Sequence, residues 1–142
     1  MHRLTHSLIC LAFVATITIA AAQSQKPTAP AQPEQKIPTI DGGIGSCSLL
    51  LTVLTQEGKP VLGADVKVHI AYGFGGFHKL DLEAYTNADG KLKFTGLPSR
   101  VHQPPLTFEA SKDDRAGIAT YDPAAECDAH HDLPLDRQKS TQ

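Results

Sequence analysis

Hydrophobic and polar residues alternate along much of the chain between residues 46 and 136, and a period of two is the pattern of half-buried β-strands. The clearest example is the segment 64–72, in which every second residue is apolar and the residues between are mostly polar. A denser apolar run at 46–55 indicates a well-buried first strand. The same alternation predicts strands over 79–85, 91–95, 106–111 and 127–135.

Turn-forming residues separate these segments. Asn87–Gly90 is typical of a tight turn, because Asn and Asp bond their own backbone and Gly adopts a positive φ without steric cost. Gly96–Pro98 ends the strand that follows, so we expect the side chain of Leu97 to fill one end of the core. The segment 116–121 is a further strand whose inner face the sequence does not define, and Pro134 favours an edge position for the last strand.

No segment of ten or more residues shows helical periodicity. About seven short strands separated by turn signals predict an all-β protein. We therefore expect a single seven-stranded antiparallel β-sandwich of the transthyretin- or immunoglobulin-like Greek-key type over residues 46–136, followed by a tail at 137–142.

The first residues predict export rather than structure. Arg3 precedes the apolar run Leu8–Ala20, and the small residues that end at Ala22 form a cleavage site, so residues 1–22 read as a secretory signal peptide. The predicted location is secreted or periplasmic, and no second apolar stretch is long enough for a stable membrane span. Residues 23–45 are rich in Pro, Gln and Ala and predict a disordered linker.

Charge narrows the possible partners. The chain has 13 basic and 15 acidic residues, and removal of Arg3 with the signal peptide leaves 12 against 15, a net charge of 12 − 15 = −3. The Lys and Arg residues are scattered along the sequence, so no basic patch indicates a nucleic acid or an anionic membrane surface as partner.

Two cysteines remain after the signal peptide, because Cys10 lies within it and too early for a lipid-attachment sequence. An even pair in an exported chain predicts one disulfide between Cys47 and Cys127. Free thiols or thiolates on a metal are the alternatives, although Cys-x-x-Cys and zinc-finger spacings are absent from the sequence.

Three segments together carry a family resemblance: Gly58–Val66, Thr86–Phe94 and Gly96–Pro98. They resemble the carboxypeptidase regulatory-like domain over roughly Leu49–Ser111. The resemblance implies a transthyretin-like (prealbumin-like) sandwich, close to carbohydrate-binding-like folds, that serves as an accessory module of exported or envelope proteins. Fold analogy raises the expectation of binding or scaffolding without establishing it.

The loop at 72–78 is the first candidate site. It places Tyr72, Phe74, Phe77 and His78 among three glycines, so at least one ring could lie at an exposed tip. Exposed aromatic rings stack on sugars or insert into a partner's pocket. The alternative is a hairpin loop whose rings fold back onto the sandwich.

The last strand carries the second candidate. Asp128, His130 and Asp132 occupy alternate positions, so their side chains share one face of a strand. Oxygen and nitrogen ligands of this kind suit zinc, manganese or calcium, whereas the alternative is an ordinary solvated face. Asn87–Gly90 resembles the start of a calcium loop, but the later ligands are missing and turn chemistry explains it.

Catalytic motifs are absent from the sequence: it lacks Gly-x-Ser-x-Gly, His-Glu-x-x-His and a glycine-rich loop before a helix. Two groups of enzymes have related sandwiches. Hydroxyisourate hydrolases end in Tyr-Arg-Gly-Ser, which this chain lacks. Intradiol dioxygenases bind iron through two Tyr and two His, and Tyr72, Tyr85 and Tyr121 form no recognisable arrangement with the histidines.

We therefore predict an exported, non-catalytic β-sandwich module without a cofactor, which binds an envelope protein or a glycan or acts as a scaffold. The alternative is a small metal-binding protein or metal-dependent enzyme that uses the face formed by Asp128, His130 and Asp132. A structural spacer held out by the linker is a third possibility.

Overall fold

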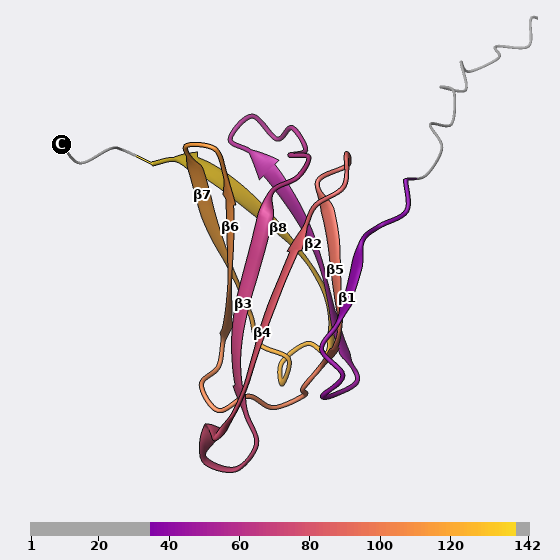
Figure 1. Ribbon diagram of the computed structural model, residues 1–142, viewed down its shortest axis with the longest axis vertical. Coiled ribbons are helices and arrows are strands. Elements are labelled where there is room, and N and C mark those ends of the chain that lie inside the picture. The colour runs from indigo at the N-terminus through magenta and orange to yellow at the C-terminus, as the bar shows by residue number, and fades with distance from the viewer. Residues whose placement is uncertain (1–34, 139–142) are drawn as a thin grey trace, which may run out of the picture. The chain divides into compact units, whose positions relative to one another are not determined.

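The computed structural model describes residues 35–138, in which strands alternate with short loops and no α-helix occurs (Figure 1). The predicted signal peptide, most of the predicted linker and the final residues lie outside this described part. The elements are β1 (Thr39–Asp41), β2 (Cys47–Thr55), β3 (Asp65–Tyr72), the 3₁₀-helix η1 (Phe74–Gly76), β4 (His78–Tyr85), β5 (Lys91–Leu97), β6 (Leu106–Lys112), β7 (Arg115–Tyr121) and β8 (Asp128–Arg137).

All eight strands belong to one sheet, in the order β1-β5-β2-β8-β7-β6-β3-β4. The sheet narrows between β7 and β8, which pair only at Arg115 with Arg137 and at Ala116 with Asp136. Its two edges approach each other, because Gly42, directly after β1, lies beside the side chains of Leu80 and Leu82 on β4. The sheet is therefore a nearly closed, barrel-like structure (Figure 1).

The all-β prediction is confirmed, but the seven-stranded antiparallel sandwich is not. The eighth strand is β1, a three-residue segment inside the range 23–45 that we expected to be a linker. Two pairings are parallel, β1 with β5 and β2 with β8. Alternation of apolar residues defines which face of a strand is buried, but it does not say which strands are neighbours. Neither parallel pair could therefore be predicted from the sequence.

The core consists of the alternate side chains that the sequence pattern predicted. Every strand except β1 contributes buried apolar residues, and Leu97 fills one end of the core as expected. Aromatic rings from β5, β6 and β7 meet in its interior, with centroids 5.0 Å apart for Phe94 and Phe108 and 6.4 Å apart for Phe108 and Tyr121. The edge-on contact between Phe94 and Phe108 connects β5 and β6, which are not adjacent in the sheet.

The turn at Asn87–Gly90 forms as predicted. The Asn87 side-chain oxygen accepts hydrogen bonds from the backbone N–H groups of Asp89 and Lys91, at 3.0 and 2.9 Å. Gly90 has a φ of +69°, and an added Cβ would meet the backbone of Val53 and Pro60. Turn chemistry and close packing therefore explain this segment, and no calcium ligand is needed for it.

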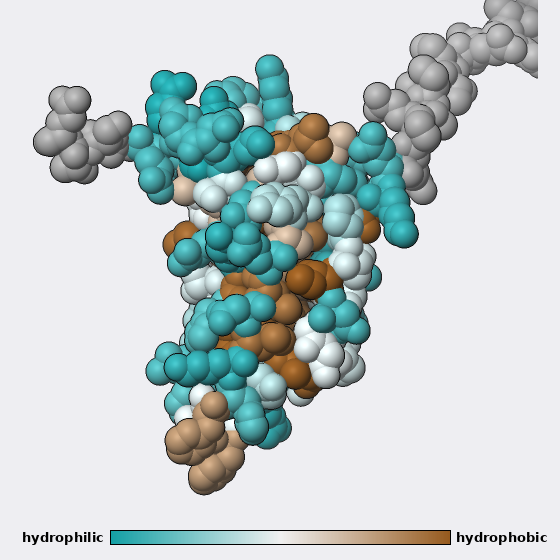
Figure 2. Space-filling model, in the orientation of Figure 1, coloured by the Kyte–Doolittle hydropathy of each residue, from teal (hydrophilic) through white to brown (hydrophobic). Residues whose placement is uncertain are grey.

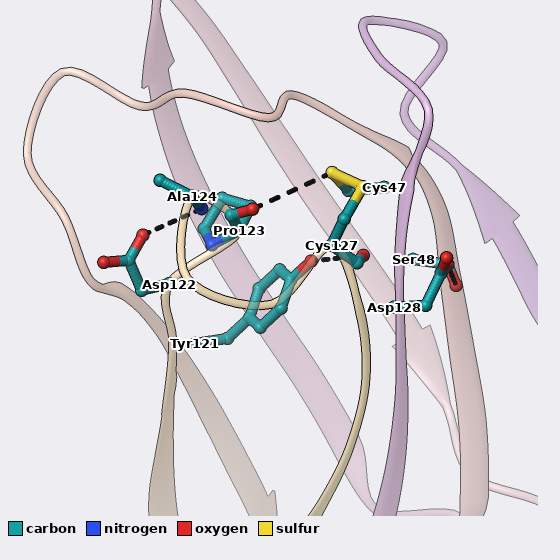
Figure 3. Close-up of a disulfide and its surroundings, with 8 residues drawn as sticks. All are labelled: Cys47, Ser48, Tyr121, Asp122, Pro123, Ala124, Cys127 and Asp128. Carbon is teal, nitrogen blue, oxygen red and sulfur yellow. Dashed lines mark hydrogen bonds between the residues drawn. A yellow bond between two sulfur atoms is a disulfide. The ribbon is translucent and has the colours of Figure 1, made fainter.

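The structure joins Cys47 to Cys127 by a disulfide, 80 residues apart in sequence (Figure 3). The bridge connects the first residue of β2 to the residue before β8. The carbonyl oxygen of Cys127 accepts hydrogen bonds from the Tyr121 hydroxyl and the Ser48 backbone N–H, both at 2.8 Å. Within residues 35–138, no helix has the length and hydrophobicity required to cross a membrane.

Candidate functional site

The face predicted from the last strand lies on the outside of the sheet, where β8 runs parallel to β2. Asp128, His130 and Asp132 are all exposed there, because the residues between them face the core. The register places Ser48 beside Asp128 and Thr52 beside Asp132. The candidate residues therefore have hydroxyl side chains as their neighbours on β2.

Hydrogen bonds divide this face into two pairs. Ser48 donates its hydroxyl to Asp128 at 2.6 Å. The His130 Nε2 atom lies 2.8 Å from the Thr52 hydroxyl oxygen and 3.8 Å from the nearer carboxylate oxygen of Asp132. Thr52 and Asp132 thus converge on one imidazole nitrogen, whereas Asp128 is occupied by Ser48.

The spacing along β8 limits how many of these side chains one ion could reach. A strand rises about 3.3 Å per residue, so Asp128 and Asp132 are separated by roughly 13 Å along the strand. In the described part of the chain, no group of three or more His, Cys, Asp or Glu side chains is placed to hold a metal. Metal binding at this face stays a prediction, with His130 and Asp132 as the pair that the structure brings together.

The Gly-aromatic loop forms η1 and protrudes beyond the end of β3. Tyr72 stacks on His78, with ring centroids 5.3 Å apart, and so closes the base of the loop. Phe74 and Phe77 do not fold back: their side chains are 94% and 81% exposed. The four predicted residues therefore form two sets, one ring pair at the base and two rings at the tip.

Another polar cluster lies on the outer face of β3, β4 and β6. His69 Nδ1 lies 2.6 Å from an Asp81 carboxylate oxygen, across the β3–β4 pair. Lys67 contacts Asp65 at 3.1 Å and Glu83 at 3.4 Å, and its hydrogen bond to Asp65 raises the Lys67 pKa above its usual value. All of these residues except Asp65 line a groove of about 600 Å³. Alternation places His69 on an outward face without indicating a role, although the hairpin register pairs it with Asp81.

No protein-family model matches the chain, and no curated protein matches its sequence. Among solved structures, catechol 1,2-dioxygenase from Pseudomonas arvilla C-1 has a TM-score of 0.50 at 14% sequence identity, with 75% of this chain and 60% of that chain covered. Hydroxyquinol 1,2-dioxygenase from Pseudomonas putida DLL-E4 has a TM-score of 0.47 at 12% identity, over 82% of this chain and 69% of that chain.

A third similar structure is the dioxygenase domain of a dioxygenase carbohydrate-binding protein fusion from Streptomyces sp. SirexAA-E. Its TM-score is 0.44 at 16% identity, with 77% of this chain and 98% of that chain covered. At these identities the likeness concerns the fold, and of these three structures the Pseudomonas arvilla enzyme has the highest TM-score, 0.50. The chain spans about 60% of the length of that enzyme.

These comparisons change four predictions. The resemblance to the carboxypeptidase regulatory-like domain is not confirmed, and the solved structure that shares the fold at a TM-score of 0.50 is catechol 1,2-dioxygenase. The predictions of a non-catalytic module and of no enzymatic activity were based on that resemblance and on the absence of catalytic motifs, and the match to an enzyme, catechol 1,2-dioxygenase, contradicts both. The prediction of no cofactor is contradicted as well, because the enzyme that shares the fold is a catechol 1,2-dioxygenase, and intradiol dioxygenases bind iron.

The described residues do not, however, gather two tyrosines and two histidines around one ion. Tyr72 stacks on His78 at one end of the β3–β4 hairpin, and Tyr85 lies at the other end, opposite Asp65. Tyr121 is buried, and its hydroxyl donates to the carbonyl oxygen of Cys127. The dioxygenase fold is thus present without that ligand set in residues 35–138, and no dioxygenase step follows from this geometry.

Proposed function

We propose that the protein binds a divalent transition-metal ion on the outer face of β2 and β8, and that this ion has open coordination positions suited to catalysis. The observation that supports the proposal is the convergence of Asp132 and Thr52 on His130 Nε2, at 3.8 and 2.8 Å. The dioxygenase fold adds support, since metal-dependent enzymes are built on it.

The distances suit an ion between the two side chains. Zinc–nitrogen and zinc–carboxylate bonds are each about 2.0–2.2 Å, so an ion that contacts His130 Nε2 and the Asp132 carboxylate bridges a gap of up to roughly 4 Å. Imidazole with carboxylate is a ligand combination for zinc, nickel, copper or iron rather than for magnesium. The Thr52 hydroxyl supplies a further oxygen beside the same nitrogen.

Two strong protein ligands leave most coordination positions to water or substrate. Structural zinc sites are filled by four protein ligands, whereas catalytic sites keep a position open. A bound ion would act here as a Lewis acid, and the side chains of His130 and Asp132 would hold it at the surface. Asp128, fixed by Ser48, adds a negative charge to the same face.

Titration calorimetry with Zn²⁺ and Ni²⁺ tests the proposed ligands. We expect the affinity for the metal to fall by about tenfold or more in His130→Gln and in Asp132→Asn. Even the loss of a residue that only hydrogen-bonds to a metal ligand lowers metal affinity by roughly 10–100-fold. His69→Gln, on an exposed strand face elsewhere in the sheet, is the matched control and should retain the wild-type affinity. Equal affinity in wild type and His130→Gln would refute the site.

The open positions have a separate test. The protein is loaded with Co²⁺, and azide is added while the visible spectrum is recorded. A spectral change that requires His130 shows that the ion accepts an external ligand, as a catalytic site must. A spectrum that azide leaves unchanged would contradict the catalytic part of the proposal, even if the ion binds.

A further inference from the structure

Two loops far apart in sequence meet at one end of the sheet. The backbone N–H of His102, in the loop between β5 and β6, donates to the carbonyl oxygen of Ala71 at the end of β3. The His102 ring also lies against Gly76, where an added Cβ would come within 2.7 Å of it. The Gly-aromatic loop and the segment 98–105 therefore form one surface, which we term the aromatic tip.

Phe74 and Phe77 are the two most exposed large apolar side chains in residues 35–138, at 94% and 81%. The loop between β3 and β4 lies at the lower end of the molecule in Figure 1, and the space-filling view in the same orientation shows a brown projection there (Figure 2). Leu62 and Ile118 are less exposed and lie on other parts of the sheet. The tip is thus a protrusion with two adjacent apolar rings, rather than a groove.

The charges around these rings have one sign. Neither 72–80 nor 98–105 contains Asp or Glu, although the whole chain has a net charge of −2. Lys79 is paired with Ala71 across the hairpin, and Arg100 is two residues from His102. Both cations are exposed. Folding therefore gathers at the tip basic residues that are scattered in the sequence.

We propose that the aromatic tip binds the surface of an anionic lipid bilayer. Phe74 and Phe77 would enter the boundary between head groups and acyl chains, while Lys79 and Arg100 contact the negative head groups. Aromatic rings combined with basic residues are the composition of interfacial membrane anchors. A protruding tip suits a bilayer because it needs no complementary pocket, and its charge is complementary to anionic lipid.

A tryptophan reporter tests this proposal, because the chain contains no Trp. Phe74→Trp is mixed with vesicles of equimolar phosphatidylcholine and phosphatidylglycerol, or of phosphatidylcholine alone. We expect a blue shift of the emission with the anionic vesicles and little change with the neutral ones. Ile118→Trp, exposed on β7, is the matched control and should show no shift. Because the Trp side chain lies at the tip, its emission reports contact between the tip and lipid, even if other segments of the chain also bind the vesicle.

Charge variants in the Phe74→Trp background test the basic residues. Lys79→Gln with Arg100→Gln should raise the lipid concentration for half-maximal shift by about tenfold or more. Lys59→Gln with Arg137→Gln removes the same charge elsewhere and should leave the lipid concentration unchanged. Absence of an emission shift with anionic vesicles, or an equal shift with neutral vesicles, would overturn the proposal. It would also be overturned if an added purified protein shifted the emission while vesicles did not.

Discussion

Tyr121 joins two parts of the structure through a single side chain. Its ring is 1% exposed and packs edge-on against Phe108 and His131. Its hydroxyl donates to the carbonyl oxygen of Cys127, beside the disulfide (Figure 3). Burial, reinforced by the charges of Asp128, Glu126 and Asp122, raises the pKa of Tyr121 to about 12. The neutral phenol is therefore the form that the folded protein stabilises.

This pKa predicts a loss of stability in alkali. Above pH 10, Tyr121 of the unfolded chain loses its proton while the folded chain keeps it, so the free energy of unfolding falls until about pH 12. Two pKa units correspond to a loss of up to about 3 kcal/mol. Urea denaturation at pH 9 and pH 11 measures about half of this loss, roughly 1.4 kcal/mol, because the rest occurs above pH 11.

The tyrosine variants separate this effect from other groups that titrate in alkali. Tyr121→Phe should be less stable at neutral pH by about 1 kcal/mol, through the lost hydrogen bond, but should lose less stability between pH 9 and pH 11. Tyr85→Phe, which is 58% exposed, should retain the full wild-type loss. The same loss in Tyr121→Phe and wild type would contradict the assignment.

For single residues, the sequence predicts which side chains are exposed but not which side chains they contact. The outward positions of Asp128, His130 and Asp132 follow from alternation alone, and the structure has all three exposed. The role of Thr52 did not follow, because its contact with His130 depends on the parallel register of two strands 78 residues apart. The proximity of Lys79 and Arg100 to the aromatic tip could not be predicted either, because only the folded loops bring them to the same end of the sheet.

Among the elements, β7 is the strand whose packing the sequence left open. Its inward residues include Gly117, where an added Cβ would collide with the Pro134 carbonyl oxygen and lie 2.8 Å from Leu133 Cδ2. Pairing between β7 and β8 ends one residue earlier, at Ala116 with Asp136. A glycine is therefore needed for the two strands to pass closely where their ladder stops.

We expect Gly117→Ala to lower the free energy of unfolding by about 1–3 kcal/mol, because either the β8 backbone or the Leu133 side chain must shift. Urea denaturation followed by circular dichroism measures the change. Thr120→Ala, at an exposed position of the same strand, should stay within about 0.5 kcal/mol of wild type. A fully stable Gly117→Ala would show that β7 and β8 can separate without cost.

The buried face of most strands could be predicted from the sequence, but the pairing of strands was harder to predict. Alternation in 64–72 matches β3, and the Asn87–Gly90 turn joins β4 to β5 as expected. β1 was missed because three residues with one inward apolar side chain, Ile40, carry too little periodicity to distinguish a strand from a linker. Its partner β5 supplies the hydrogen bonds that the sequence pattern cannot reveal.

At the scale of the whole molecule, one covalent link spans most of the chain. The Cys47–Cys127 disulfide closes a loop with a sequence separation of 80, and it ties the starts of the parallel strands β2 and β8. The cysteine count and the predicted export indicated this pairing, and the structure agrees with it. The closing of so long a loop removes many conformations from the unfolded chain.

Replacement of both cysteines by alanine should lower the free energy of unfolding by about 2–5 kcal/mol, with roughly 4.5 kcal/mol expected from loop entropy alone. Urea denaturation of wild type with and without reductant should give the same difference. Reductant should have no effect on the stability of the double variant. A double variant as stable as the oxidised wild type would mean that the unfolded chain is already restrained by other contacts.

The same bridge decides how the domain would respond to mechanical tension. A force applied through the segments before β1 and after β8 can peel β1 from β5, but it then reaches Cys47 and passes directly through the sulfur atoms to Cys127. The residues from 48 to 126 are bypassed and cannot be drawn out. The oxidised domain would therefore lengthen only by the segments outside the disulfide, and the residues between the two cysteines would add no length.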